Sequence, residues 1–521
     1  MKQQPRILSL PGGDQLGHGA PGALAAFPLQ AMERATGAPV IEGNAIKLQF
    51  EGSSTFEAWR DAIAQAERFV YFENYIFRDD RVGHAFRDAL VAKASQGVRV
   101  CLIYDWIGCW ATPRRYWRPL RAAGVEVRVF NRPALRDPLG VLQRDHRKLV
   151  CVDGAVAFVG GFCVGVEWAG SRDSPPWRDT GVEVRGPAAA VAARAFERIW
   201  SEIGAPQAEP LAVDPASVGP VGDTPVWIIE GEPGRSRVYR TLTLVAAHAR
   251  RRLWITDPYF VAPRPVSEAL AAAARGGIDV RVLLPAHNNW PLVGSLSRGG
   301  YRFLLESGVR LFEWQGPMIH AKTSVSDGVW ARVGSSNLNT ASLLGNWEMD
   351  VGVLDEGLAA QLEALFLADL ASSVEIVLPR MQVRLEAPAA LEEREPPKTS
   401  LEPEGTLSER LERELRSPVK AGSTGWRMAD LVRAGSVFGT AIAGHRPLGR
   451  EDRTVLGTVS GIVLVLAALF AIFPSVAGWI GAILLGWLGT VIGVRSLLEA
   501  REARNEERRV RRVIEGAGTD T

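Results

Sequence analysis

The hydrophobic pattern of the N-terminal part of the chain occurs twice. An apolar stretch with a late tyrosine leads into a helical run, a glycine that ends the helix and a buried strand, and a second helical run ends at a glycine before a short strand. The corresponding segments of the two copies are 69–77 and 253–261, 97–102 and 277–282, and 124–127 and 308–311. Strands that alternate with helices predict α/β layers in each copy.

Further along the chain, two uncharged apolar runs lie close together, 454–473 and 476–494, separated by Pro474 and Ser475. They contain 20 and 19 residues. At about 1.5 Å per helical residue, each run is as long as the hydrocarbon of a bilayer is thick. The runs predict a transmembrane helical hairpin. The alternative is a buried helical hairpin of a soluble domain, where charge-free runs of this length are uncommon.

The surroundings of this hairpin predict its orientation. Arginines precede and follow it, and prolines and glycines near the N-terminus interrupt every candidate h-region of a signal peptide. Both flanks, and with them the body of the protein, are expected on the cytoplasmic side. Gly457 and Gly461, and again Gly489 and Gly493, have the G-x-x-x-G spacing that lets helices approach closely. The two helices would therefore pack on each other, and they could also join two copies into a homo-oligomer.

Composition divides the chain into seven segments. Residues 386–407 are rich in Glu and Pro, which is typical of a linker, and 426–442 would form either an amphipathic helix on the membrane surface or a plain connecting helix. The predicted order is an N-terminal segment (1–43), the first repeat (44–205), the second repeat (206–380), the linker (381–425), the interfacial helix (426–450), the transmembrane hairpin (454–494) and a basic cytoplasmic tail (495–521).

Charge and cysteine content exclude several classes of protein. The 60 Lys and Arg nearly cancel the 58 Asp and Glu, so no overall basic field favours nucleic acid as a partner. The four cysteines form no C-x-x-C pair, and no H-x-x-x-H pattern or aspartate cluster lies beside the repeated histidines. We therefore expect no disulfide framework, no metal site and no cofactor.

Both copies carry the same polar motif at their next corresponding point. The motif consists of His146, Lys148 and Asp153 in the first copy and of His320, Lys322 and Asp327 in the second. The offset is 174 residues for all three pairs, which makes a coincidence very improbable. Each aspartate is followed by glycine, and an Asp-Gly pair between apolar runs predicts a β-hairpin with a two-residue turn.

A two-residue turn fixes the partners of the motif on the returning strand. In that register Lys148 faces Val159, His146 faces Gly161, and in the second copy His320 faces Ser335. Histidine and lysine lie two residues apart, so their side chains share one face of the hairpin.

These residue types suit a phosphate group. Lysine supplies a point charge, the glycine Gly161 lets backbone N–H groups approach, and the side chains of Ser335, Ser336 and Asn337 supply donors. Two copies place two histidines around one phosphate. One imidazole can attack phosphorus while the other protonates the leaving oxygen and later deprotonates the incoming alcohol.

Each copy also supplies a carboxylate downstream, Asp179 in the first and Glu348 in the second. A nucleophilic imidazole needs its other nitrogen held by an acceptor, and these carboxylates can serve as acceptors. For Asp153 and Asp327 two interpretations stay open, a direct catalytic role and a purely structural role in the turn.

The two H-x-K-x-x-x-x-D motifs, followed by Gly-Gly or Gly-Ser-Ser-Asn, resemble the phospholipase D superfamily from about residue 44 to 378. Segments 73–77, 144–148, 177–179 and 334–338 are most similar to bacterial cardiolipin synthases. The resemblance implies an α/β fold of two tandem repeats, each a mixed sheet flanked by helices. It also implies a single site formed by both motifs, Asp153 and Asp327 included.

By the same resemblance, the reaction would carry a phosphatidyl group on a histidine and join two phosphatidylglycerol molecules with release of glycerol. We expect His146 as the nucleophile and His320 as the acid and base. The substrates would be phospholipids, and the location would be a bacterial inner membrane with the catalytic domain on the cytoplasmic side.

Three features depart from the pattern of that family. Cys163 stands where asparagine is usual after Gly-Gly, so one phosphate donor is missing. Residues 339–341 replace the usual Asp-x-Arg, which bears on the acceptor alcohol. The predicted membrane hairpin follows the repeats, whereas the resembling synthases commonly carry theirs before them.

Other functions remain open at this point. A phospholipase D would use the same site with water as the acceptor, and a metal-independent nuclease would cut the same kind of bond in nucleic acid, which the charge balance disfavours. A catalytically dead membrane scaffold would require a broken motif, and neither motif is broken.

An aromatic and basic segment favours a lipid. Trp106, Trp110, Tyr116 and Trp117 lie in one segment with Arg114, Arg115, Arg118 and Arg121, a composition suited to a lipid interface. The alternative is an ordinary amphipathic helix that begins near Pro113.

Overall fold

The structure is a computed structural model of the chain and describes residues 29–132, 143–172, 174–207 and 211–378. The strands of the first repeat are β1 (Ile41–Gln49), β2 (Phe69–Asn74), β3 (Arg99–Asp105), β4 (Glu126–Phe130), β5 (Lys148–Val152), β6 (Val156–Gly160) and β7 (Gly181–Arg185). Helix α1 (Leu29–Thr36) precedes this repeat. The helices of the repeat are α2 (Gly52–Gln65), α3 (Arg81–Ser95), α4 (Arg114–Ala122), α5 (Val166–Ala169) and α6 (Pro187–Glu202).

The second repeat follows a short 3-10 helix, η2 (Pro215–Ser217), and has the same order of elements with two additions, a second helix before β11 and a last strand, β15. Its strands are β8 (Thr224–Gly231), β9 (Arg252–Thr256), β10 (Asp279–Pro285), β11 (Arg310–Trp314), β12 (Thr323–Ser326), β13 (Trp330–Gly334), β14 (Glu348–Leu354) and β15 (Ser373–Ile376). Its helices are α7 (Arg237–His248), α8 (Arg264–Arg275), α9 (Pro291–Gly299), α10 (Tyr301–Glu306), the π-helical turn η3 (Ala341–Gly345) and α11 (Glu356–Leu370).

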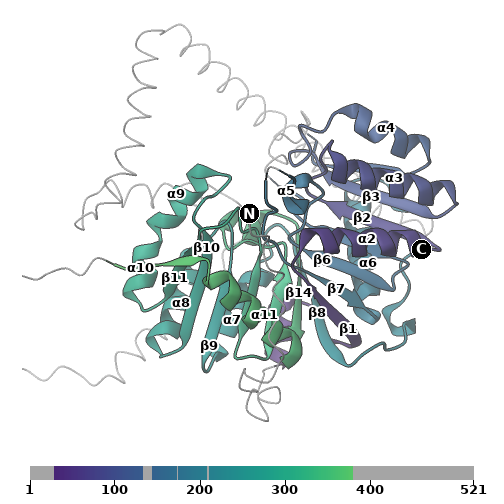
Figure 1. The fold of residues 1–521 in the computed structure, drawn as a ribbon. Coiled ribbons are helices and arrows are strands. Elements are labelled where there is room, and N and C mark those ends of the chain that lie inside the picture. Colours follow the sequence, from purple (N-terminus) through teal and green to yellow (C-terminus); the bar gives the residue numbers. More distant parts are fainter. Residues whose placement is uncertain (1–28, 133–142, 173, 208–210, 379–521) are drawn as a thin grey trace, which may run out of the picture. The chain divides into compact units, whose positions relative to one another are not determined.

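All these strands form one mixed sheet, in the order β15-β11-β10-β9-β12-β13-β14-β8-β1-β7-β6-β5-β2-β3-β4. Neighbours among β2, β3 and β4, and among β9, β10 and β11, are parallel, and the other pairs are antiparallel. The order reads the same outward from the β1–β8 junction in both directions, apart from the extra edge strand β15. Each repeat therefore supplies one half of the sheet (Figure 1), and the predicted mixed α/β architecture is confirmed.

The alternation of side chains along the strands divides the core into layers. In β2, Phe69 and Tyr71 point to one face, and Val70 and Phe72 point to the other. The second face packs against α2, α3 and α4, and the corresponding face of the other half-sheet packs against α7, α8 and α10. The remaining faces of both halves belong to one continuous core, to which α6 and α11 contribute. The two repeats are thus joined by shared apolar packing as well as by strand pairing.

The two Asp-Gly hairpins are present, but their register differs from the predicted one. Asp153 and Asp327 have φ values of 55° and 56°, and the glycines after them are also in the left-handed region, as a type I′ turn requires. A third residue follows before pairing begins, so Val152 pairs with Val156 and Leu149, not Lys148, pairs with Val159. The predicted cross-strand partners of Lys148, His146 and His320 were therefore wrong by one residue.

The carboxylate of Asp153 holds this turn against the start of the neighbouring strand. It accepts hydrogen bonds from the backbone N–H groups of Glu67, Arg68 and Phe69 at 2.7–2.8 Å. Asp327 does the same in the second repeat with the backbone N–H groups of residues 250–252, at 2.8–2.9 Å. These contacts favour the structural interpretation of both aspartates.

Several predicted segments lie outside the described residues: the linker, the interfacial helix, the two apolar runs of the hairpin and the basic tail. Within the described ranges, no helix is long and apolar enough to cross a membrane.

Replacement of Asp153 by Ala is expected to lower the free energy of unfolding by about 1–3 kcal/mol, because three backbone donors lose a charged acceptor. The measurement is the urea midpoint of unfolding. Asp88, a largely exposed carboxylate whose ion pair is with the neighbouring Arg87, gives the matched control, and Asp88→Ala should change stability by less than about 0.5 kcal/mol. Equal effects of the two substitutions would contradict the structural role of Asp153.

Candidate active site

The two histidines lie where the two halves of the sheet meet, and each is held by backbone of the opposite repeat. The N–H of His146 donates to the carbonyl of Trp347 at 2.9 Å, and the N–H of His320 donates to the carbonyl of Arg178 at 2.6 Å. Trp347 and Arg178 directly precede the two carboxylates predicted from the sequence. The same backbone pairing thus brings each carboxylate to the histidine of the other repeat.

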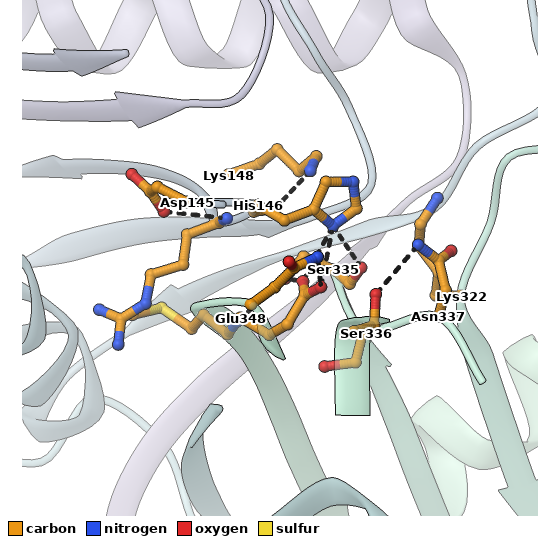
Figure 2. Close-up of polar contacts among 12 residues, drawn as sticks. Asp145, His146, Lys148, Lys322, Ser335, Ser336, Asn337 and Glu348 are labelled. Atoms are coloured by element: carbon orange, nitrogen blue, oxygen red, sulfur yellow. Dashed lines mark hydrogen bonds and ion pairs between the residues drawn. The ribbon is translucent and has the colours of Figure 1, made fainter. Parts of the chain in front are cut away.

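The side chains confirm this exchange between repeats. The Nδ1 atom of His146 lies 2.9 Å from Oε2 of Glu348, and Nδ1 of His320 lies 2.6 Å from Oδ2 of Asp179. Figure 2 shows Glu348 on one side of the His146 ring and Lys148 on the other. All four groups of the two pairs are buried. Each half of the site is therefore built from both copies of the motif.

The pKa values indicate neutral imidazoles beside ionised carboxylates. Burial, followed by the charge of Lys322, lowers the pKa of His320 to about 3, and burial also lowers the pKa of His146. Burial alone would raise the pKa of Asp179, but the facing His320 brings it down to about 2, and the pKa of Glu348 is lowered by His146 in the same way. Each imidazole then donates its Nδ1 proton to a carboxylate and keeps a lone pair on Nε2.

Two buried lysines complete the charge distribution of the site. The ammonium groups of Lys148 and Lys322 each donate to the carbonyl of the histidine two residues earlier. They also lie 5.2 Å and 5.8 Å from the ring centroids of Tyr75 and Tyr259. Burial lowers the pKa of Lys322 to about 8, and the charge of Lys148 contributes to the shift. Two cations therefore act on one another in a single site, which suits an anionic ligand.

Two of the predicted phosphate ligands are engaged elsewhere. The hydroxyl of Ser335 donates to Glu348 at 2.6 Å and accepts from the N–H of Met349, so its single proton is used. The N–H of Gly161 donates to the carbonyl of Thr180. A Cβ at Gly161 would lie 2.0 Å from Oδ1 of Asp179, so this glycine makes room for the carboxylate. The structure corrects these two residues from phosphate ligands to supports of the carboxylates.

Ser336 and Asn337 remain available for a ligand. The Ser336 hydroxyl and the Asn337 side-chain oxygen are buried and have no hydrogen-bond partner among the described residues. The Asn337 amide nitrogen donates to Ser342 at 3.3 Å. Cys163 occupies the position that corresponds to Asn337 in the first repeat, and burial raises the pKa of its thiol to about 11. The first repeat therefore offers a neutral, weak donor where the second offers an amide.

Asp153 and Asp327 are not part of this group. Each lies five residues beyond its lysine at the far end of a strand, which is about 16 Å away at 3.3 Å per residue. The hydrogen bonds of the two aspartates to backbone N–H groups are made at the turn of each hairpin, away from the histidines.

The tyrosines of the site were not among the predicted site residues. The ring of Tyr75 lies 4.9 Å from that of His146, and the ring of Tyr259 lies 5.8 Å from that of His320, both edge to face. Trp168 was also missed; its Nε1 donates to Asp179 at 2.8 Å. Tyr75 and Tyr259 could have been identified from the sequence, because a tyrosine recurs at this position in both copies. No group of three or more His, Cys, Asp and Glu side chains suited to a metal ion occurs in the described part of the chain.

Comparisons with known proteins agree with this geometry. A family model described as "Cardiolipin synthase, PLD-like domain" matches residues 59–168 and 244–370, and each segment contains one histidine and lysine motif. Cardiolipin synthase A of Pseudomonas aeruginosa (strain LESB58) is 36% identical over 353 residues, which cover 67% of this chain and 71% of the relative. The chain belongs to the cardiolipin synthase family.

A second relative of this family, cardiolipin synthase A of Pseudomonas putida (strain W619), is 33% identical over 67% of this chain and 73% of its own length. Among solved structures, the phosphatidylserine synthase of Haemophilus influenzae Rd KW20 is similar with a TM-score of 0.54 and 13% identity, over 67% of this chain and 91% of that one. That likeness concerns the fold alone. As a member of the cardiolipin synthase family, the protein is an enzyme, a phosphatidyltransferase of the phospholipase D type.

The protonation of the site can be observed by ¹⁵N NMR of the histidine rings. A lowered pKa means that the neutral form persists to lower pH, so the His320 ring is expected to stay neutral between about pH 5 and 8 and to titrate only near pH 3. The spectrum of His320→Ala assigns the resonance. A titration midpoint at or above about 6.5 would contradict the neutral imidazole.

Proposed function

We propose that the enzyme transfers a phosphatidyl group from phosphatidylglycerol to the hydroxyl of a second phosphatidylglycerol, through a phosphohistidine, and releases glycerol. The observation that carries the proposal is the exchanged pairing of His146 with Glu348 and of His320 with Asp179 beside two buried lysines. The name of the relatives, cardiolipin synthase, supports the product.

In the first step, Nε2 of one imidazole attacks phosphorus, and the bond from phosphorus to the glycerol oxygen breaks. The other imidazole, protonated, gives its proton to the leaving oxygen. The negative charge of the bound phosphodiester offsets the lysine charges that lower the pKa of the histidines, so substrate binding makes this protonation easier. Lys148 and Lys322 stabilise the charge that develops on the phosphoryl oxygens.

In the second step, the acid of the first step acts as a base. It removes the proton of the incoming hydroxyl, whose oxygen attacks phosphorus as the bond from phosphorus to histidine breaks. Both histidines return to their starting state, and two phosphatidyl units are joined. Water in place of the alcohol would give phosphatidic acid, the product of a phospholipase D.

The charges around the two imidazoles favour His320 as the nucleophile and His146 as the acid and base, the reverse of the order expected from the sequence. Each carboxylate accepts from two further groups, Asp179 from Trp168 and the N–H of Thr180, and Glu348 from Ser335 and Asn346. The difference lies in the lysines: after burial, the charge of Lys322 is the largest influence on His320, and it lowers that pKa. For His146, the largest influence after burial is the charge of Glu348, which raises the pKa of this histidine. His146 therefore takes up a proton more readily.

For the part of the chain beyond the described residues, we propose the membrane hairpin at 454–494. The two apolar runs and the flanking arginines support it. It would tether the catalytic body to the cytoplasmic leaflet of a bacterial inner membrane, where the substrate lipids lie. A homo-oligomer through the G-x-x-x-G faces would be compatible with this arrangement.

Incubation of the purified enzyme with labelled phosphatidylglycerol should yield cardiolipin and glycerol. His146→Ala and His320→Ala should each lower turnover about 10⁴-fold or more, because each removes a group that reacts with substrate. Asp153→Asn should retain turnover in the folded fraction. Phosphatidic acid as the sole product would identify a hydrolase, and cleavage of oligonucleotides without lipid turnover would identify a nuclease.

Reporters fused before Met1 and after Thr521 should both score as cytoplasmic. A two-residue turn at Pro474 and Ser475 leaves no room for a domain on the far side, so an even number of spans returns the chain to the side where it began. A periplasmic signal from either fusion would refute the hairpin.

A further inference from the structure

Two tryptophans are largely exposed to solvent. Trp110 is 76% exposed and Trp290 is 64% exposed, and no other tryptophan of the described residues is among the exposed large apolar side chains. An isolated exposed apolar residue needs no explanation, but exposed tryptophan at related places in two repeats does.

The two tryptophans occupy equivalent positions in the repeats. Trp110 lies five residues after Asp105, the last residue of β3, and Trp290 lies five residues after Pro285, the last residue of β10. β3 and β10 correspond, because they are the parallel neighbours of β2 and β9. The exposed side chain thus follows the same strand end twice, in two loops that differ in sequence.

Both loops lie against the tyrosines that cover the histidines. The chain at Gly108 comes so close to the carbonyl oxygen of Tyr75 that a Cβ there would lie 1.9 Å from it. In the second repeat the Tyr259 hydroxyl donates to the side-chain oxygen of Asn289 at 2.8 Å, next to Trp290. Trp110 and Trp290 therefore flank the active site, one on the side of each histidine.

The surroundings of Trp110 are basic. Helix α4 begins four residues later and exposes Arg114, Arg115, Arg118 and Arg121, while its aromatic residues are buried. Tyr116 and Trp117 are 1% and 3% exposed, so these two belong to the amphipathic helix foreseen as the alternative. Tryptophan prefers the interfacial region of a bilayer, and arginines close to an anionic surface are attracted to it.

We propose that Trp110 and Trp290 insert into the interfacial region of an anionic phospholipid bilayer and hold the mouth of the active site against the membrane. The proposal rests on the proposed function, since a lipid substrate must pass from the bilayer to the histidines. With one tryptophan on each side of the site, a lipid could move from the leaflet to the lysines without crossing bulk water.

The first test measures docking without turnover. The full-length enzyme is reconstituted in phosphatidylglycerol vesicles whose acyl chains carry bromine, which quenches tryptophan fluorescence at short range. The double variant Trp110→Phe and Trp290→Phe keeps apolar side chains but lacks the two fluorophores. The difference in fluorescence between wild type and this variant should be quenched by brominated lipid, and an unquenched difference would overturn the proposal.

The second test separates docking from chemistry. The double variant Trp110→Ala and Trp290→Ala should lose about tenfold in kcat/KM on phosphatidylglycerol bilayers but less than about twofold on a short-chain phosphatidylglycerol that is dissolved as monomers. Equal losses on both substrates would overturn the proposal. Val221→Ala is the control, because Val221 is 56% exposed and precedes β8 at the end of the sheet opposite to the site. If no lipid is turned over, the proposed function fails, while quenching still decides the docking.

Discussion

The site depends on the exchange of carboxylates between the two repeats. Neither repeat supplies the hydrogen-bond acceptor for its own histidine. The acceptor for Nδ1 of His146 is Glu348, and the acceptor for Nδ1 of His320 is Asp179. The backbone hydrogen bonds that bring these side chains together join residues 144 and 146 to residue 347, and residues 318 and 320 to residue 178. The continuous sheet and the shared core keep the halves in this register. Loss of the contact between repeats would therefore remove both histidine–carboxylate pairs at once.

Four buried charged groups make the arrangement costly in the absence of a ligand and favourable in its presence. Two ionised carboxylates face two neutral imidazoles, and the two lysine cations are close enough that each affects the pKa values on the other side. A bound phosphodiester supplies a negative charge that offsets the charge of these two lysines. In the proposed mechanism, the site would hold one imidazole neutral for attack and, after the substrate binds, allow the other to carry a proton.

The duplication made much of this site predictable. A constant offset of 174 residues selected the histidines and lysines, and the glycines that end the helices indicated the α/β repeats. The sequence could not show which carboxylate serves which histidine, because both assignments satisfy the same spacing. The hairpin register was missed for a local reason, the third loop residue after Asp-Gly. Gly161 and Ser335 were taken as ligands because the sequence does not reveal that a carboxylate already occupies the space beside them.

The claim that two repeats form one site with two unlike histidines is tested most directly by burst kinetics with phosphatidyl-p-nitrophenol, whose leaving group needs no acid. A single site with His320 as the nucleophile should give a burst of about one p-nitrophenol per chain for wild type and for His146→Ala, and no burst for His320→Ala. Two independent sites would instead give about two per chain for wild type and about one for each variant. That second result would contradict a single site shared by the two repeats.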